Sequence, residues 1–112
     1  MAIRLDKPWR SLDEALAKLR GNMGVFQLAD EAGEVIYIGF AGGRSQFGLG
    51  GQVRDLAAQI PEATQVRWEV TTAYQSRFRE LLAVHQADHG ALPQYNIELN
   101  HRPVRLSRLS PA

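Results

Sequence analysis

The sequence predicts a small α/β protein of the α+β kind, in which helices flank a three-stranded mixed or antiparallel sheet. Residues 24–28 alternate as in a half-buried strand, and residues 35–40 are rich in β-branched and aromatic side chains. A turn of about five residues that contains Gly33 joins the two runs, which is typical of a β-hairpin. Residues 65–71 form a third alternating run, and helical patterns surround the strands. The predicted order is therefore α-β-β-α-β-α.

The first helix is predicted to begin at Ser11, because Ser11 and Glu14 have the spacing of a capping box, and to stop at Gly21. Residues 41–51 contain five glycines, so we expect a flexible or tightly turning loop there. Residues 92–96 contain Pro93 and are expected to be extended.

Two further helices follow from apolar spacing. One covers about residues 52–60 and is stopped by Pro61, and the other runs from residue 72 or 73 to 89 and is stopped by Gly90. No internal repeat or linker divides the chain, so residues 1–98 are interpreted as one domain with an N-terminal capping helix, and residues 99–112 as a basic tail.

Composition limits the class of protein. The chain has 112 residues, no cysteine and a net charge of +1, which divides into −2 for residues 1–98 and +3 for the tail. Disulfides and thiolate metal sites are thereby excluded. No apolar run is long enough for a membrane span and the N-terminus is too polar for a secretory signal, so we expect a cytoplasmic protein without a membrane partner.

The hairpin carries two short motifs, Gly24-Val25-Phe26 and Tyr37-Ile38-Gly39. With the arginine-bearing helix, the third strand, Glu80 on the last helix and a Pro-x-x-Asn ending at Asn96, the chain resembles the GIY-YIG nuclease superfamily over roughly residues 23–96. The resemblance implies a divergent, stand-alone member of that superfamily.

The resemblance also implies a mechanism for metal-dependent hydrolysis of a nucleic-acid phosphodiester. Glu80 would bind Mg²⁺ or Mn²⁺ as an oxygen ligand, and the ion would neutralise charge on the phosphate. Tyr37 would help to activate water, Asn96 would brace the site, and an arginine would hold the phosphate. That arginine is Arg54 on the helix or Arg44 in the glycine-rich segment, because the spacing typical of the family falls on Phe47.

The residues also favour an alternative, a catalytically degenerate domain that binds nucleic acid or a protein. Phe26 stands where the family usually has a tyrosine, so one hydroxyl is missing. Glu80 lies three residues after Arg77 and could form an i, i+3 ion pair with it instead of binding a metal. The slightly acidic domain leaves nucleic acid, a protein partner and a homodimer as possible partners.

Overall fold

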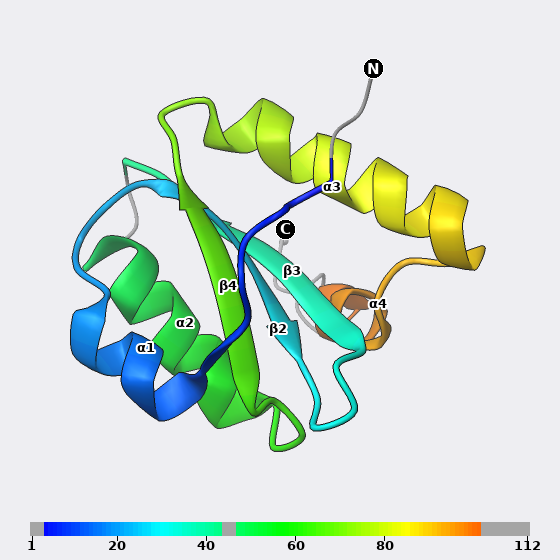
Figure 1. Cartoon of the computed structure of the whole chain (residues 1–112). Helices are drawn as coiled ribbons and strands as arrows, with labels where there is room; N and C mark the ends of the chain where they lie inside the picture. The colour runs from blue at the N-terminus through cyan, green and yellow to red at the C-terminus, as the bar shows by residue number, and fades with distance from the viewer. Residues whose placement is uncertain (1–3, 44–46, 102–112) are drawn as a thin grey trace, which may run out of the picture.

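The computed structural model describes residues 4–43 and 47–101, which form four strands and four helices within those ranges. A four-stranded sheet has the order β1-β4-β2-β3, and all three pairings are antiparallel (Figure 1). The elements are β1 (Arg10–Ser11), α1 (Leu12–Lys18), β2 (Gly24–Ala29), β3 (Val35–Ala41), α2 (Gly48–Gln59), β4 (Gln65–Val70), α3 (Tyr74–His89) and α4 (Gln94–His101). The expected α+β class and the hairpin are confirmed.

The prediction of three strands was wrong, because β1 adds a fourth. This strand has only two residues, and it pairs through Arg10 with Val66 and through Ser11 with Gln65. The amide of Leu12 extends the pairing by donating to the Thr64 carbonyl at 3.0 Å. Two residues are too few to show strand alternation, so only the tertiary pairing reveals β1.

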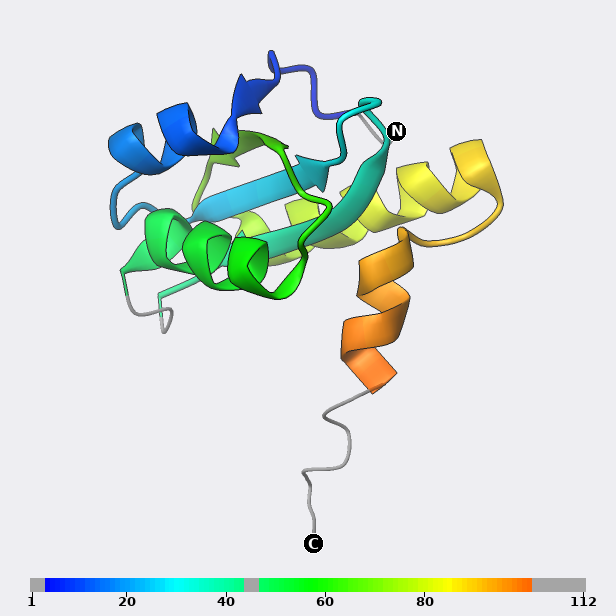
Figure 2. The same cartoon turned by 90° about the horizontal axis from the view of Figure 1, so that it is seen from below.

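The sheet has two covered faces, which we name after their main helices. On the α2 face, α1 and α2 pack over Phe26, Leu28 and Val66, and α4 packs at the β3 end of the same cluster. On the α3 face, Leu81 and the buried Leu5 of the N-terminal segment pack over Val25 and Ile38. Figures 1 and 2 show α2 and α3 on opposite sides of the sheet.

Both hairpin motifs have a structural explanation. Phe26 lies opposite Gly39 in the pairing of β2 with β3, and a Cβ on Gly39 would lie 2.5 Å from Cζ of Phe26. Gly24 lies opposite Val70, and a Cβ there would lie 2.1 Å from the Glu69 carbonyl oxygen of β4. Each glycine therefore makes room for a neighbouring ring or strand.

The glycine-rich segment is shorter than expected, because α2 begins at Gly48 and not near residue 52. Gly48 has φ +56°, and a Cβ there would lie 2.3 Å from the carbonyl carbon of Gly21. The amides of Leu49 and Gly50 donate to the carbonyls of Asn22 and Arg20, at 2.9 and 3.0 Å. Glycines start this helix because its first turn packs directly on the chain that leaves α1, which supplies the missing carbonyl partners.

The remaining boundaries match the sequence in part. Ser11 caps α1 by accepting from the Glu14 amide at 3.3 Å, although the helix ends at Lys18, before the expected stop at Gly21. Gly90 ends α3 in the left-handed conformation at φ +80°, as predicted. The prediction of an extended segment at residues 92–96 was wrong, because α4 begins directly after Pro93. This helix also continues to His101, into residues 99–112 that were assigned to the tail.

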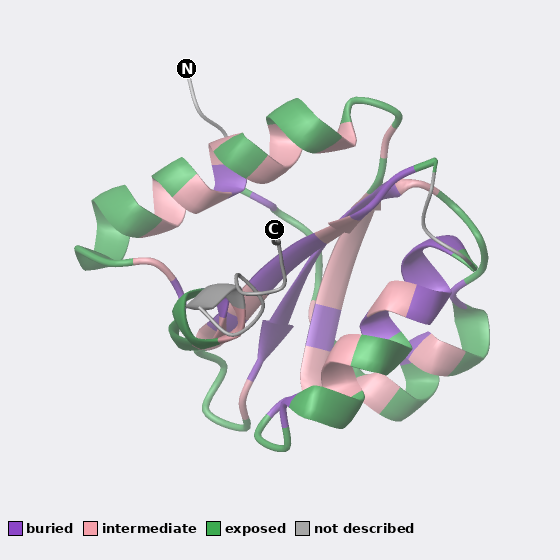
Figure 3. Cartoon of the chain, turned by 180° about the vertical axis from the view of Figure 1, so that it is seen from behind, coloured by how far each residue is buried: buried purple, intermediate pink, exposed green. Residues whose placement is uncertain are grey.

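Burial follows this layered plan (Figure 3). Strand β2 is buried along its whole length, whereas β4 ends at Val70, which is 57% exposed. No helix in residues 4–43 and 47–101 is long and apolar enough to cross a membrane.

Candidate functional site

Tyr37 lies on β3 with its side chain on the α2 face. Its ring is 6.1 Å from that of Phe26, and both rings belong to the cluster under α2. Burial raises the pKa of the Tyr37 phenol above its usual value of 10.0. A phenol that activates water must lose its proton easily, so this environment acts against the predicted catalytic role.

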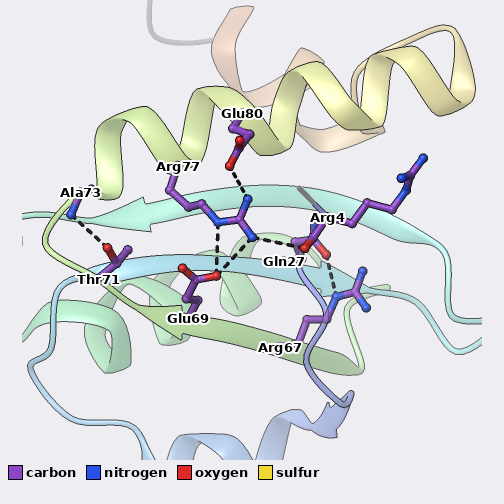
Figure 4. A network of polar contacts seen from close by, with 8 residues as sticks. All are labelled: Arg4, Gln27, Arg67, Glu69, Thr71, Ala73, Arg77 and Glu80. Carbon is purple, nitrogen blue, oxygen red and sulfur yellow. Dashed lines mark hydrogen bonds and ion pairs between the residues drawn. The ribbon is translucent and has the colours of Figure 1, made fainter. Parts of the chain in front are cut away.

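Glu80 lies on the opposite face, on the side of α3 that meets the sheet. Its carboxylate accepts from the Arg77 guanidinium at 2.5 Å, and the same guanidinium contacts Glu69 of β4 at 3.2 Å (Figure 4). The Arg77 side chain is only 13% exposed, whereas the two carboxylate side chains are 30% exposed. The i, i+3 pairing of Glu80 with Arg77, the alternative reading of this residue, is confirmed.

A metal ion does not fit Glu80 in this arrangement. The guanidinium of Arg77 already supplies positive charge to both Glu69 and Glu80, and it occupies the space between their carboxylates. Among the described residues, no group of three or more His, Cys, Asp or Glu side chains is placed to hold an ion. A Mg²⁺ or Mn²⁺ ion at Glu80 would first have to displace the Arg77 guanidinium.

The polar contacts continue from Arg77 along the α3 face to the N-terminal segment. Arg77 also donates to the carbonyl of Arg4 at 3.3 Å, and Arg4 forms an ion pair with Asp88 of α3 at 2.6 Å. The buried Gln27 accepts from Arg67 at 2.7 Å, and the Arg67 guanidinium lies 4.3 Å from the ring of Trp9. These contacts hold the N-terminal segment across the sheet, so we assign them a structural role.

Asn96 is buried at the outer edge of β3. Its Oδ1 accepts from the Ile38 amide and its Nδ2 donates to the Ile38 carbonyl, both at 2.8 Å. The side chain thus replaces a neighbouring strand at this residue. Asn96 therefore holds the backbone of the Tyr37-Ile38-Gly39 motif from within a helix. Its predicted role in bracing a catalytic site stays a prediction.

Arg54 and Arg44 are the two candidates for the arginine that would hold a phosphate. Arg54 is exposed on α2, next to the fully buried Val53, and forms no ion pair with another described residue. Arg44 lies outside the described residues. The structure therefore brings Asn96 to the strand of Tyr37, but it separates Tyr37 from Glu80 by the thickness of the sheet.

A cleft that sequence reasoning missed lies beside the outer edge of β4. It has a volume of about 360 Å³ and is lined by the N-terminal segment and the upper half of the strand, through Lys7, Pro8, Arg10, Trp68, Glu69 and Val70. The alternation of β4 predicts which side chains share a face, but it gives no sign that one edge of the strand is open. The cleft therefore became visible only in the tertiary structure.

Comparison with known families assigns the chain to a group without a described activity. Residues 3–88 match a domain of unknown function, DUF7508, and the chain belongs to this family. A search of curated proteins gives no match. The matched segment includes the sheet, α1, α2 and nearly all of α3, and it ends before Asn96.

Proposed function

We propose that the protein is a divergent GIY-YIG-like domain that binds a protein partner and does not hydrolyse phosphodiesters. One observation carries the proposal: the Glu80 carboxylate is held by Arg77 on the α3 face, whereas the Tyr37 ring packs beside Phe26 on the α2 face. The likeness to the superfamily rests on the hairpin with its two motifs and on the contact between Asn96 and β3.

Three of the groups that the hydrolytic mechanism would use lack support. Activation of water needs a phenol with a lowered pKa, but burial raises the pKa of Tyr37. Binding of a divalent cation needs a carboxylate that is free to coordinate it, but Glu80 is engaged by a guanidinium. Phe26 has no hydroxyl to contribute. These three features favour a domain in which Tyr37 and Glu80 contribute to packing and to an ion pair and do not carry out hydrolysis.

Charge favours a protein over a nucleic acid as the partner. Nucleic-acid affinity derives mainly from Lys and Arg side chains that neutralise phosphates and release counterions. Residues 1–98 have a net charge of −2, and two of their arginines are already paired with carboxylates, Arg77 in the network of Figure 4 and Arg4 at Asp88. A protein surface does not require a large positive field.

The proposal is tested by incubating the full chain with Mg²⁺ or Mn²⁺ and labelled single- and double-stranded DNA and RNA. We expect no cleavage above that of the Glu80→Gln variant, which serves as the matched control. Metal-dependent cleavage by the wild type that disappears in Glu80→Gln, with both proteins showing the same thermal unfolding midpoint, would overturn the proposal.

A further inference from the structure

The outer edge of β4 has no partner strand on the C-terminal side of Val66, the second residue of β4. Strand β2 pairs with β4 along all six residues, but on the other side β1 pairs only with Val66 and Gln65. The amide of Thr71 donates to Met23 on the β2 side, so the alternation of an antiparallel ladder turns the backbone groups of Trp68 and Val70 outward. No strand among the described residues lies beside these two residues.

Pro8 explains why β1 stops. The register pairs Arg10 with Val66, and two residues further it would place Pro8 opposite Trp68. Proline has no amide hydrogen, so it cannot donate to the Trp68 carbonyl and the ladder cannot continue. Beyond Pro8 the chain leaves the edge, because Leu5 is buried under α3.

The side chains around this edge combine apolar surface with positive charge. Val70 is 57% exposed, and Trp68 is only partly buried. Lys7 forms no ion pair with another described residue, and Arg10 makes only a 3.8 Å contact with Glu14 while its side chain stays 44% exposed. Glu69, the one acidic residue of the cleft lining, is already paired with Arg77.

The opposite edge of the sheet provides a contrast. At β3, the side chain of Asn96 satisfies both backbone groups of Ile38, so a second strand cannot pair there. Natural sheets usually protect their edges in such ways, because an exposed edge pairs with other chains. The described residues contain no comparable side chain for Trp68 and Val70.

We propose that the cleft beside β4 binds an extended peptide of acidic and apolar residues, which adds a strand to the sheet at Trp68 and Val70. The peptide backbone would pair with the outward groups of these two residues, as in β-strand addition. Its acidic side chains would lie near Lys7 and Arg10, and its apolar side chains would cover Val70 and Trp68. This site rests on the proposed function only in requiring a protein partner. The four residues from Arg67 to Val70 span about 13 Å, so the docked segment is four or five residues long.

The experiment uses the full chain and a fluorescein-labelled peptide of alternating glutamate and valine, with binding followed by fluorescence anisotropy. We expect saturable binding, and at least tenfold weaker binding by the Lys7→Glu/Arg10→Glu double variant. Arg79→Glu is the control, because this exposed arginine of α3 lies outside the cleft. Thermal unfolding of each variant establishes that it is folded.

Two further measurements separate strand addition from mere charge attraction. A peptide of the same sequence with alternate amides N-methylated retains its charge but cannot pair, and we expect it to bind at least tenfold more weakly. Hydrogen exchange of the Trp68 and Val70 amides should slow at least tenfold when the unmodified peptide is bound. Equal binding of the two peptides, or unchanged exchange at both amides, would overturn the inference.

In parallel, the protein is titrated into a fluorescein-labelled oligothymidylate of twelve nucleotides. If the oligothymidylate binds to the wild type and not to the double variant, and the peptide does not bind, the cleft is assigned to nucleic acid and the inference is overturned. The proposed absence of hydrolysis would not be affected by this result. Conversely, metal-dependent cleavage that requires Glu80 would refute the proposed function and leave the peptide result unaffected.

Discussion

Replacement of Asn96 by alanine tests whether this residue holds the edge of the sheet. The change removes two hydrogen bonds of 2.8 Å to Ile38, which is fully buried, from a residue that is itself 3% exposed. Each backbone group left without a partner costs about 1–3 kcal/mol, so we expect the free energy of unfolding to fall by about 2–5 kcal/mol. For a domain of this size, such a loss lowers the thermal midpoint by roughly 10 °C or more.

The measurement is urea unfolding followed by circular dichroism, with Gln94→Ala as the control. Gln94 is an amide on the same helix, but it is exposed and bonds only to Glu98 on the surface. Its replacement should change the unfolding free energy by no more than about 0.5 kcal/mol. If Asn96→Ala unfolds at the same urea concentration as Gln94→Ala, the assigned edge role is wrong.

Asn96→Asp adds a test that depends on pH. A protonated aspartic acid can accept from the Ile38 amide and donate to its carbonyl, whereas the carboxylate can only accept and carries a buried charge. The folded-state pKa of Asp at this position is therefore raised above the unfolded value of about 3.9. Stability relative to wild type should be greatest below about pH 4 and should decrease as the pH rises through the raised pKa. A difference from wild type that stays constant between pH 3.5 and about 7 would refute this reasoning.

Two further predictions concern the motif residues. Gly39→Ala should lower the free energy of unfolding by about 1–3 kcal/mol, because its Cβ would lie 2.5 Å from Phe26 Cζ. In urea unfolding, adding Phe26→Leu should relieve much of this loss, and strictly additive effects of the two changes would contradict the contact. In an ultraviolet titration compared with Tyr37→Phe, the Tyr37 phenol should ionise above pH 10.0. Because the phenol of the unfolded chain ionises first, the contribution of Tyr37 to stability is present below pH 10 and decreases above it. Ionisation of Tyr37 below pH 10.0 would restore its role in activating water.

The sequence by itself determined the features that depend on local contacts. Strand alternation and the intervening glycine specify the β2–β3 hairpin, because side-chain direction and turn geometry are set within a few residues. The cap at Ser11 and the left-handed stop at Gly90 are equally local. The spacing of Arg77 and Glu80 on one helix was sufficient to suggest their ion pair.

Only the tertiary structure decided which of these elements meet. Apolar spacing predicts the helix α3, but it does not tell which side of the sheet that helix covers, and that choice separates Glu80 from Tyr37. The glycine start of α2, the two-residue β1 and the insertion of Asn96 at Ile38 likewise depend on partners between 27 and 58 residues away in sequence. Contacts across such distances leave no periodic signal in the chain, because each partner looks ordinary within its own segment. For the same reason the open edge of β4 could be recognised only once its neighbours were in place.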